Sequence, residues 1–109
     1  MIHDPDYAKA YTIIRCLAWS YGYAATLHGS FTRDLDIVIV PWVNKPQPVE
    51  NLISMIEQGT KTKIQHGSPS AKPHGRQVWT LLFPEFGDPR WIDISVMPTL
   101  DKETPNANT

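Results

Sequence analysis

The chain contains 109 residues, of which 41% are hydrophobic and 19% charged, and its net charge is −1. This length suits one domain with its own core, and the near-neutral charge argues against a protein that wraps nucleic acid or binds membranes through a basic surface. With a single cysteine, Cys16, no intrachain disulfide can form. No apolar run approaches the roughly 20 residues that span a bilayer, and the first residues lack a signal-peptide pattern. We therefore expect a cytoplasmic protein that does not contact a membrane.

The first element is a predicted helix. Asp4 can cap its start, Pro5 suits its first position, and Gly22 is placed to end it. Cys16 lies on or near the apolar stripe of this helix, so we expect it to be packed in the core. The stripe, which should face a sheet, has helical spacing and consists of Tyr7, Ala10, Tyr11, Ile14, Leu17, Ala18 and Tyr21.

Two strands are predicted next, over residues 23–28 and 34–40, with the turn Gly29-Ser30 between them. Because the connection is short, these strands should be antiparallel neighbours. Asp34 and Asp36 share one strand face, with their Cα atoms about 7 Å apart. The rest of the second strand is apolar on both faces, which predicts that both faces are covered. Two carboxylates at such a place repel each other, and a divalent cation is the obvious means of holding them together.

A second helix should begin near Pro48 and end at Gly59. Residues 60–65 are expected to form an exposed edge strand, because lysines alternate along them. Residues 66–76 are too rich in glycine, proline and serine for regular structure.

The last two strands are predicted over residues 77–83 and 90–97, and residues 99–109 should be disordered. In the final strand Asp93 shares a face with Trp91 and Ser95. The expected fold over residues 1–98 is therefore α+β, with a mixed, mainly antiparallel sheet packed against two main helices.

The turn Gly29-Ser30, the pair Asp34-x-Asp36 and the later Asp93 between apolar residues form one pattern. This pattern, with the order of helices and strands, resembles the nucleotidyltransferase superfamily, whose best-known fold is the palm of DNA polymerase β. The resemblance covers residues 5–98 and implies a polymerase β palm-like fold. The run of residues 28–42 also looks like small uncharacterised proteins of bacteriophages.

By this resemblance, Asp34, Asp36 and Asp93 would be the catalytic residues and would hold two Mg²⁺ or Mn²⁺ ions about 4 Å apart. Asp93 would bind the ion nearer the attacking hydroxyl and help to deprotonate it. The backbone around Gly29 and Ser30, with the Ser30 hydroxyl, would meet the phosphates of an NTP. The implied reaction transfers a nucleoside monophosphate to an acceptor hydroxyl on a nucleic acid, a protein or a small molecule.

One departure from the family is the short segment between the turn and the acids. Only residues 31–33 separate Ser30 from Asp34, where the family has a longer segment with a short helix. Arg33 is placed to contact phosphate in its stead. The loop of residues 66–76 carries Lys72 and Arg76, which either remain solvated or close over a bound phosphate.

Two other functions fit the same residues. One is a non-catalytic palm-like domain that binds a nucleotide or a protein, and the shortened segment favours it. An oligomer or a helper subunit is compatible with the enzyme and with this alternative. The other is a structural or assembly protein of a phage that uses Trp42 and Trp91 as interface anchors.

The acids also have an ordinary alternative as salt-bridge partners. In that case Asp36 and Asp93 would pair with Arg33 or Arg90, and no metal would be needed.

Overall fold

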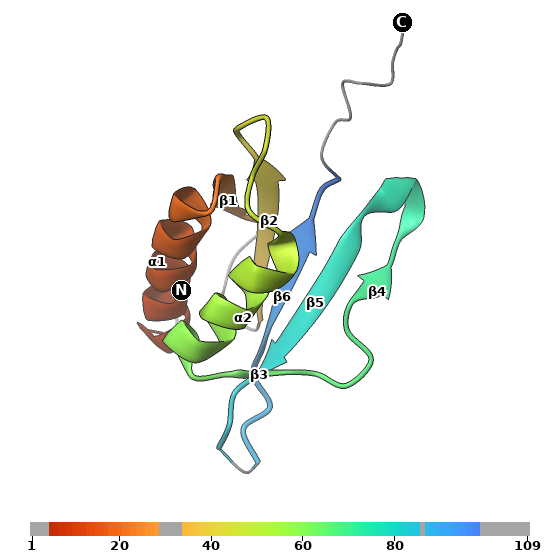
Figure 1. The fold of residues 1–109 in the computed structure, drawn as a ribbon. Coiled ribbons are helices and arrows are strands. Elements are labelled where there is room, and N and C mark those ends of the chain that lie inside the picture. Colours follow the sequence, from red (N-terminus) through yellow and green to blue (C-terminus); the bar gives the residue numbers. More distant parts are fainter. Residues whose placement is uncertain (1–4, 29–33, 86, 99–109) are drawn as a thin grey trace, which may run out of the picture.

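The computed structural model describes residues 5–28, 34–85 and 87–98. Within these residues the strands form one mixed sheet in the order β1-β2-β6-β5-β3, and β4 pairs with β5 (Figure 1). β2 and β6 are parallel, and the other described pairs are antiparallel. This confirms an α+β fold with two helices and a mixed, mainly antiparallel sheet. In chain order the elements are α1 (Pro5–Ser20), β1 (Tyr23–Leu27), β2 (Leu35–Pro41), α2 (Val49–Thr60), β3 (Lys63–Ile64), β4 (Ser70–Ala71), the short 3₁₀ helix η1 (Pro73–Gly75), β5 (Gln77–Leu82) and β6 (Trp91–Val96).

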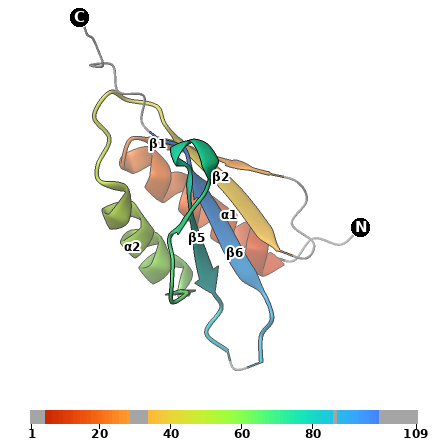
Figure 2. The same cartoon turned by 90° about the vertical axis from the view of Figure 1, so that its right-hand side faces the viewer.

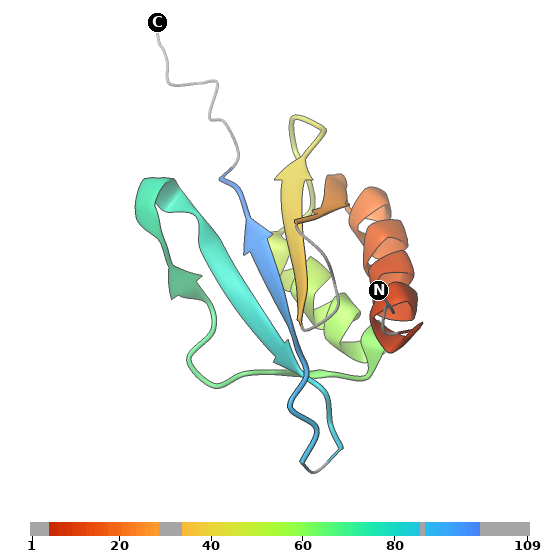
Figure 3. The same cartoon turned by 180° about the vertical axis from the view of Figure 1, so that it is seen from behind.

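The core lies between one face of the sheet and the two helices. α2 crosses in front of the strands in Figure 1 and behind them in Figure 3, and Figure 2 shows the same layer from the side. The core-facing residues of β2 and β6 are fully or almost fully buried: Leu35, Ile37, Ile39, Ile92, Ile94 and Val96.

The prediction that both faces of the second strand are covered is wrong. Val38 is only half-buried and Val40 is 40% exposed. Both helices pack on the face that carries the buried isoleucines, so neither of these described elements covers the opposite face. That opposite side is called the open face below.

α1 buries the stripe that the sequence predicted, with Tyr7, Ile14 and Ala18 fully buried. Gly22 follows the helix with φ +93°, and a Cβ there would lie 2.8 Å from Cγ2 of Val43, so only glycine fits. The prediction that Cys16 is packed is wrong, because it is exposed. Two residues along a helix turn the side chain about 200°, which points Cys16 away from the face that buries Ile14.

α2 continues past the residue expected to end it. Gly59 lies inside the helix, and Lys61 ends it in the left-handed conformation at φ 58°. A Cβ on Gly59 would lie 3.1 Å from Cγ2 of Ile13 and 3.3 Å from Cδ1 of Leu17. This glycine therefore lets α1 and α2 approach closely, and it does not act as a cap.

The segment after α2 differs from its prediction in two ways. Because α2 runs on to Thr60, the edge strand shrinks to β3. The loop of residues 66–76 is not irregular throughout, since β4 pairs with β5 and η1 follows. Asp4 and the tail of residues 99–109 lie outside the described residues. Among the helices that the structure describes, none is long and apolar enough to cross a membrane.

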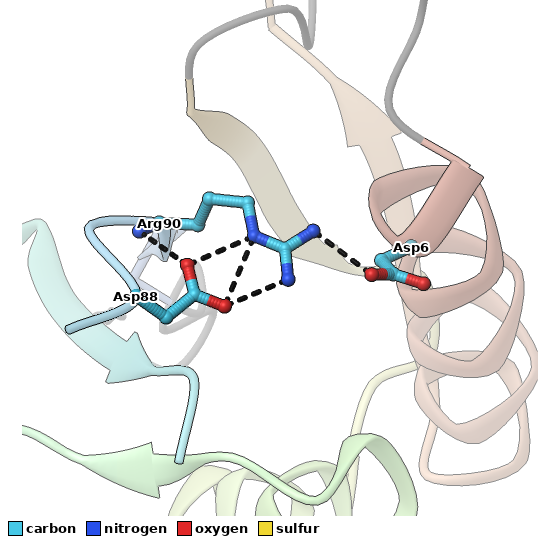
Figure 4. Close-up of polar contacts among 3 residues, drawn as sticks. All are labelled: Asp6, Asp88 and Arg90. Atoms are coloured by element: carbon cyan, nitrogen blue, oxygen red, sulfur yellow. Dashed lines mark hydrogen bonds and ion pairs between the residues drawn. The ribbon is translucent and has the colours of Figure 1, made fainter. Parts of the chain in front are cut away.

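Arg90 ties the connection between β5 and β6 to the start of α1 (Figure 4). Its Nη2 donates to Asp88 at 2.7 Å and its Nη1 to Asp6 at 2.9 Å, so the guanidinium lies between two carboxylates. The same group stacks over Phe83, 4.5 Å from the ring centroid. Arg90 therefore holds the β5–β6 connection to the start of α1 through ion pairs and through packing over an aromatic ring.

Candidate functional site

Three acids meet on the open face, where the two parallel strands begin. Asp36 on β2 and Asp93 on β6 are direct partners in the parallel register, and Asp34 immediately precedes β2. One carboxylate oxygen from each lies within 4.8 Å of the others, and all three residues are half-buried. Such oxygens suit a hard cation, although exposed acids also gather where no ion binds.

The surroundings of Asp36 disfavour the ionised form of its carboxyl group. Partial burial raises the pKa of this carboxyl, and the neighbouring charges of Asp34 and Asp93 raise it further. His28 opposes the shift, since its coulombic effect lowers the pKa. Asp36 therefore lies where a bound cation would relieve an unfavourable charge.

Asp93 is held by two neutral donors. Thr80, its cross-strand partner on β5, donates from Oγ1 to Oδ1 at 2.7 Å. Trp91, two residues earlier on β6, donates from Nε1 to Oδ2 at 3.0 Å. Within the described residues Arg90 pairs with Asp88 and Asp6, and not with Asp36 or Asp93 as the ordinary alternative expected. Arg33, the other expected partner, lies outside the described residues.

A shallow cleft of about 390 Å³ is lined by Asp36 and Asp93 and by the basic residues on either side of η1. Lys72 and Arg76 line its other side, and Nη1 of Arg76 donates to Oγ of Ser95 at 3.0 Å. Asp36, Asp93, Lys72 and Arg76 therefore share one cleft. The remaining residues expected at the site, Gly29, Ser30 and Arg33, lie outside the described residues.

Several cleft residues were not singled out from the sequence. His28, which follows β1, lines the cleft, and its backbone N–H donates to the Asp36 carbonyl at 2.9 Å. Thr80 could have been placed on the open face, because strand alternation sets it opposite Trp79 and Leu81. Its contact with Asp93 required the order of the strands, which local sequence does not give.

No protein-family model matches this chain, and a comparison with curated proteins found no match. These comparisons do not identify the class of protein, and the resemblance to nucleotidyltransferases rests on the residue pattern alone.

Proposed function

We propose that the chain is a metal-dependent nucleotidyltransferase that moves a nucleoside monophosphate from an NTP to an acceptor hydroxyl. The observation that carries this proposal is the meeting of Asp34, Asp36 and Asp93 on the open face of the sheet. Burial and the charges of the other two acids raise the pKa of Asp36, and a bound cation would relieve this unfavourable charge.

The acids fit a hard divalent cation such as Mg²⁺ or Mn²⁺. They offer carboxylate oxygens close to one another, and two of them, Asp36 and Asp93, line a cleft that a triphosphate could enter. When bound, two such ions would neutralise phosphate charge and polarise the attacking and leaving oxygens.

The basic side of the cleft suits the phosphates of the NTP. Lys72 and Arg76 line it, and in the described part of the chain neither pairs with an acid. They would hold the β- and γ-phosphates while the α-phosphorus faces the acids. The acceptor oxygen then bonds to the α-phosphorus, the bond to the bridging oxygen breaks, and pyrophosphate leaves. Asp93 would help take the proton of the hydroxyl.

The test is binding followed by transfer. Wild-type protein should bind Mn²⁺ in calorimetry, and with Mn²⁺ it should bind a non-hydrolysable NTP. Labelled NTPs with mixed RNA, protein and small-molecule acceptors should then give a labelled product. Asp36→Asn and Asp93→Asn should abolish both metal binding and transfer.

Glu85→Gln is the matched control, because it removes one negative charge from an exposed residue outside the cleft. It should leave metal binding unchanged. A wild-type protein that binds neither Mn²⁺ nor nucleotide would refute the proposal.

A second candidate, a protein-binding module without catalysis, is favoured by one surface feature. Trp19 and Trp42 stack with ring centroids 4.3 Å apart, yet remain 59% and 49% exposed. Exposed aromatic surface of this kind is typical of protein interfaces. Trp91, the other expected anchor, faces Asp93. If the module hypothesis holds, Trp42→Ser should abolish partner binding, while Asp36→Asn should not affect it.

A further inference from the structure

The two acids that line the cleft, Asp36 and Asp93, differ in the hydrogen bonds that their carboxylates accept. Each oxygen of Asp93 accepts a hydrogen bond, from Thr80 at 2.7 Å and from Trp91 at 3.0 Å. Among the described residues, no side-chain donor reaches the Asp36 carboxylate. Asp93 is therefore held in orientation by two described side chains, whereas Asp36 is held by none of the described side chains.

Both donors are placed by the sheet itself. Thr80 is the register partner of Asp93 on β5, and Trp91 lies two residues before it on β6, so all three side chains share the open face. Since β5 and β6 pair along six residues, the donors sit on the best-paired part of the sheet. Their positions do not depend on a loop.

The donors are also neutral, which affects what the carboxylate can still do. An arginine in the same place would cancel the charge of Asp93 and compete with a cation. A hydroxyl and an indole N–H leave that charge intact. Each carboxylate oxygen has a second lone pair, so both can still face a ligand.

We propose that Thr80 and Trp91 are positioning residues that fix the orientation of the Asp93 carboxylate, so that Asp93 and Asp36, its partner on the other side in β2, bind a divalent cation together. This inference rests on the proposed function, since it concerns the same metal centre. Partners that orient a metal ligand typically change metal affinity by about 10- to 100-fold when they are removed.

The first test compares Mn²⁺ affinity between variants of Thr80. Thr80→Val keeps the shape and removes the hydroxyl, so Kd should rise about 10- to 100-fold. Thr80→Ser keeps the hydroxyl and should restore an affinity close to that of wild type. Thr26→Val is the matched control, because Thr26 is exposed on the same face of β1 and does not line the cleft.

The second test uses the indole as a reporter and does not depend on the Thr80 variants folding. Tb³⁺ is a hard, oxygen-seeking ion, and Trp91 adjoins the carboxylate that would bind it. Excitation of tryptophan should produce Tb³⁺ luminescence in the wild type and in Trp42→Phe. Trp91→Phe should lose the luminescence and should also weaken Mn²⁺ binding.

The outcomes separate this inference from the proposed function. If the wild type binds no Mn²⁺, both fail. If Asp36→Asn abolishes Mn²⁺ binding but Thr80→Val and Trp91→Phe bind as wild type does, the metal centre stands and the positioning role is refuted. Weakened binding in both variants, with rescue by Thr80→Ser, supports the positioning role.

Discussion

At the residue scale, the raised pKa of Asp36 has a consequence for folding. The folded protein holds a proton on this carboxyl more tightly than the unfolded chain does, because burial and two neighbouring acids disfavour the charge. The benefit of that proton is fully present below the ordinary aspartate value of 3.8 and is lost as pH rises through the higher folded value. Ionised Asp36 therefore weakens the fold at neutral pH.

Asp36→Asn should accordingly stabilise the metal-free protein at neutral pH, by up to about 1 kcal/mol, a gain typical of relieved surface charge. The gain should disappear as pH falls below 3.8, because wild-type Asp36 is then protonated as well. Urea unfolding of both proteins in EDTA, across this pH range, measures the difference. A variant less stable at neutral pH would instead indicate a basic partner for Asp36.

Bound metal should reverse the order of stability of the wild type and Asp36→Asn. A ligand that binds only the folded state at about 100 times its Kd adds about 2.7 kcal/mol of stability. Mn²⁺ should therefore raise the stability of the wild type above that of Asp36→Asn, which it should leave unchanged. Thermal melts with Mn²⁺ and with EDTA show the exchange; a wild type indifferent to Mn²⁺ would count against the metal centre.

At the element scale, α2 ends on a residue that is poorly suited to its backbone. Lys61 adopts φ 58° and ψ 43°, and the turn is closed by its N–H donating to the Gln58 carbonyl and by the Thr62 N–H donating to the Glu57 carbonyl. A residue with a Cβ loses about 1–2 kcal/mol in this conformation, whereas glycine adopts it freely.

Lys61→Gly should thus stabilise the protein by about 0.5–1 kcal/mol, after allowing for the greater freedom of glycine in the unfolded chain. Lys61→Ala is the control and should show no such gain, because alanine keeps the Cβ. Urea midpoints at constant slope report the change. Equal effects of glycine and alanine would mean that the backbone conformation does not limit stability here.

α2 also shows which parts of the fold local sequence could predict. Pro48 correctly marked the start of the helix, whose buried residues are Leu52, Ile53 and Ile56. Its end was misplaced because Gly59 has the usual identity of a cap, while its actual role is set by Ile13 on another helix. The open face of β2 was missed for the same reason, since coverage depends on where both helices pack.

The candidate site divides in the same way. Strand alternation correctly put Asp93 on one face with Trp91, and the indole does donate to the carboxylate. Asp36 and Asp93 are register partners because β2 and β6 are adjacent in the sheet. These two strands are distant in sequence, so local patterns could not predict the pairing. Thr80 lies on a third strand, β5, so no local sequence pattern could predict its contact with Asp93.

At the scale of the whole molecule, the sheet separates two kinds of surface. One face is buried under the helices, and the other keeps the acids and basic residues of the cleft accessible. Arg90 acts away from that cleft, where it joins the β5–β6 connection to the first turn of α1 (Figure 4). Because this contact links residues 84 positions apart in the chain, it should matter for the stability of the entire fold.

Arg90→Met tests that link, since it keeps an apolar stem against Phe83 and removes the charge shared by Asp88 and Asp6. Hydrogen bonds from Arg90 lower the pKa of Asp88, so their stabilising effect is present above the ordinary value of 3.8 and is lost as pH falls through the lower folded value. The variant should melt lower at neutral pH, by on the order of 5 °C, and the gap to wild type should narrow in acid. Arg90→Lys, which keeps the charge without the fork of donors, should fall between them. Thermal melts from neutral to acid pH measure the difference in melting temperature between wild type and Arg90→Met. A difference that does not change with pH would assign the loss to packing over Phe83 and not to the ion pairs.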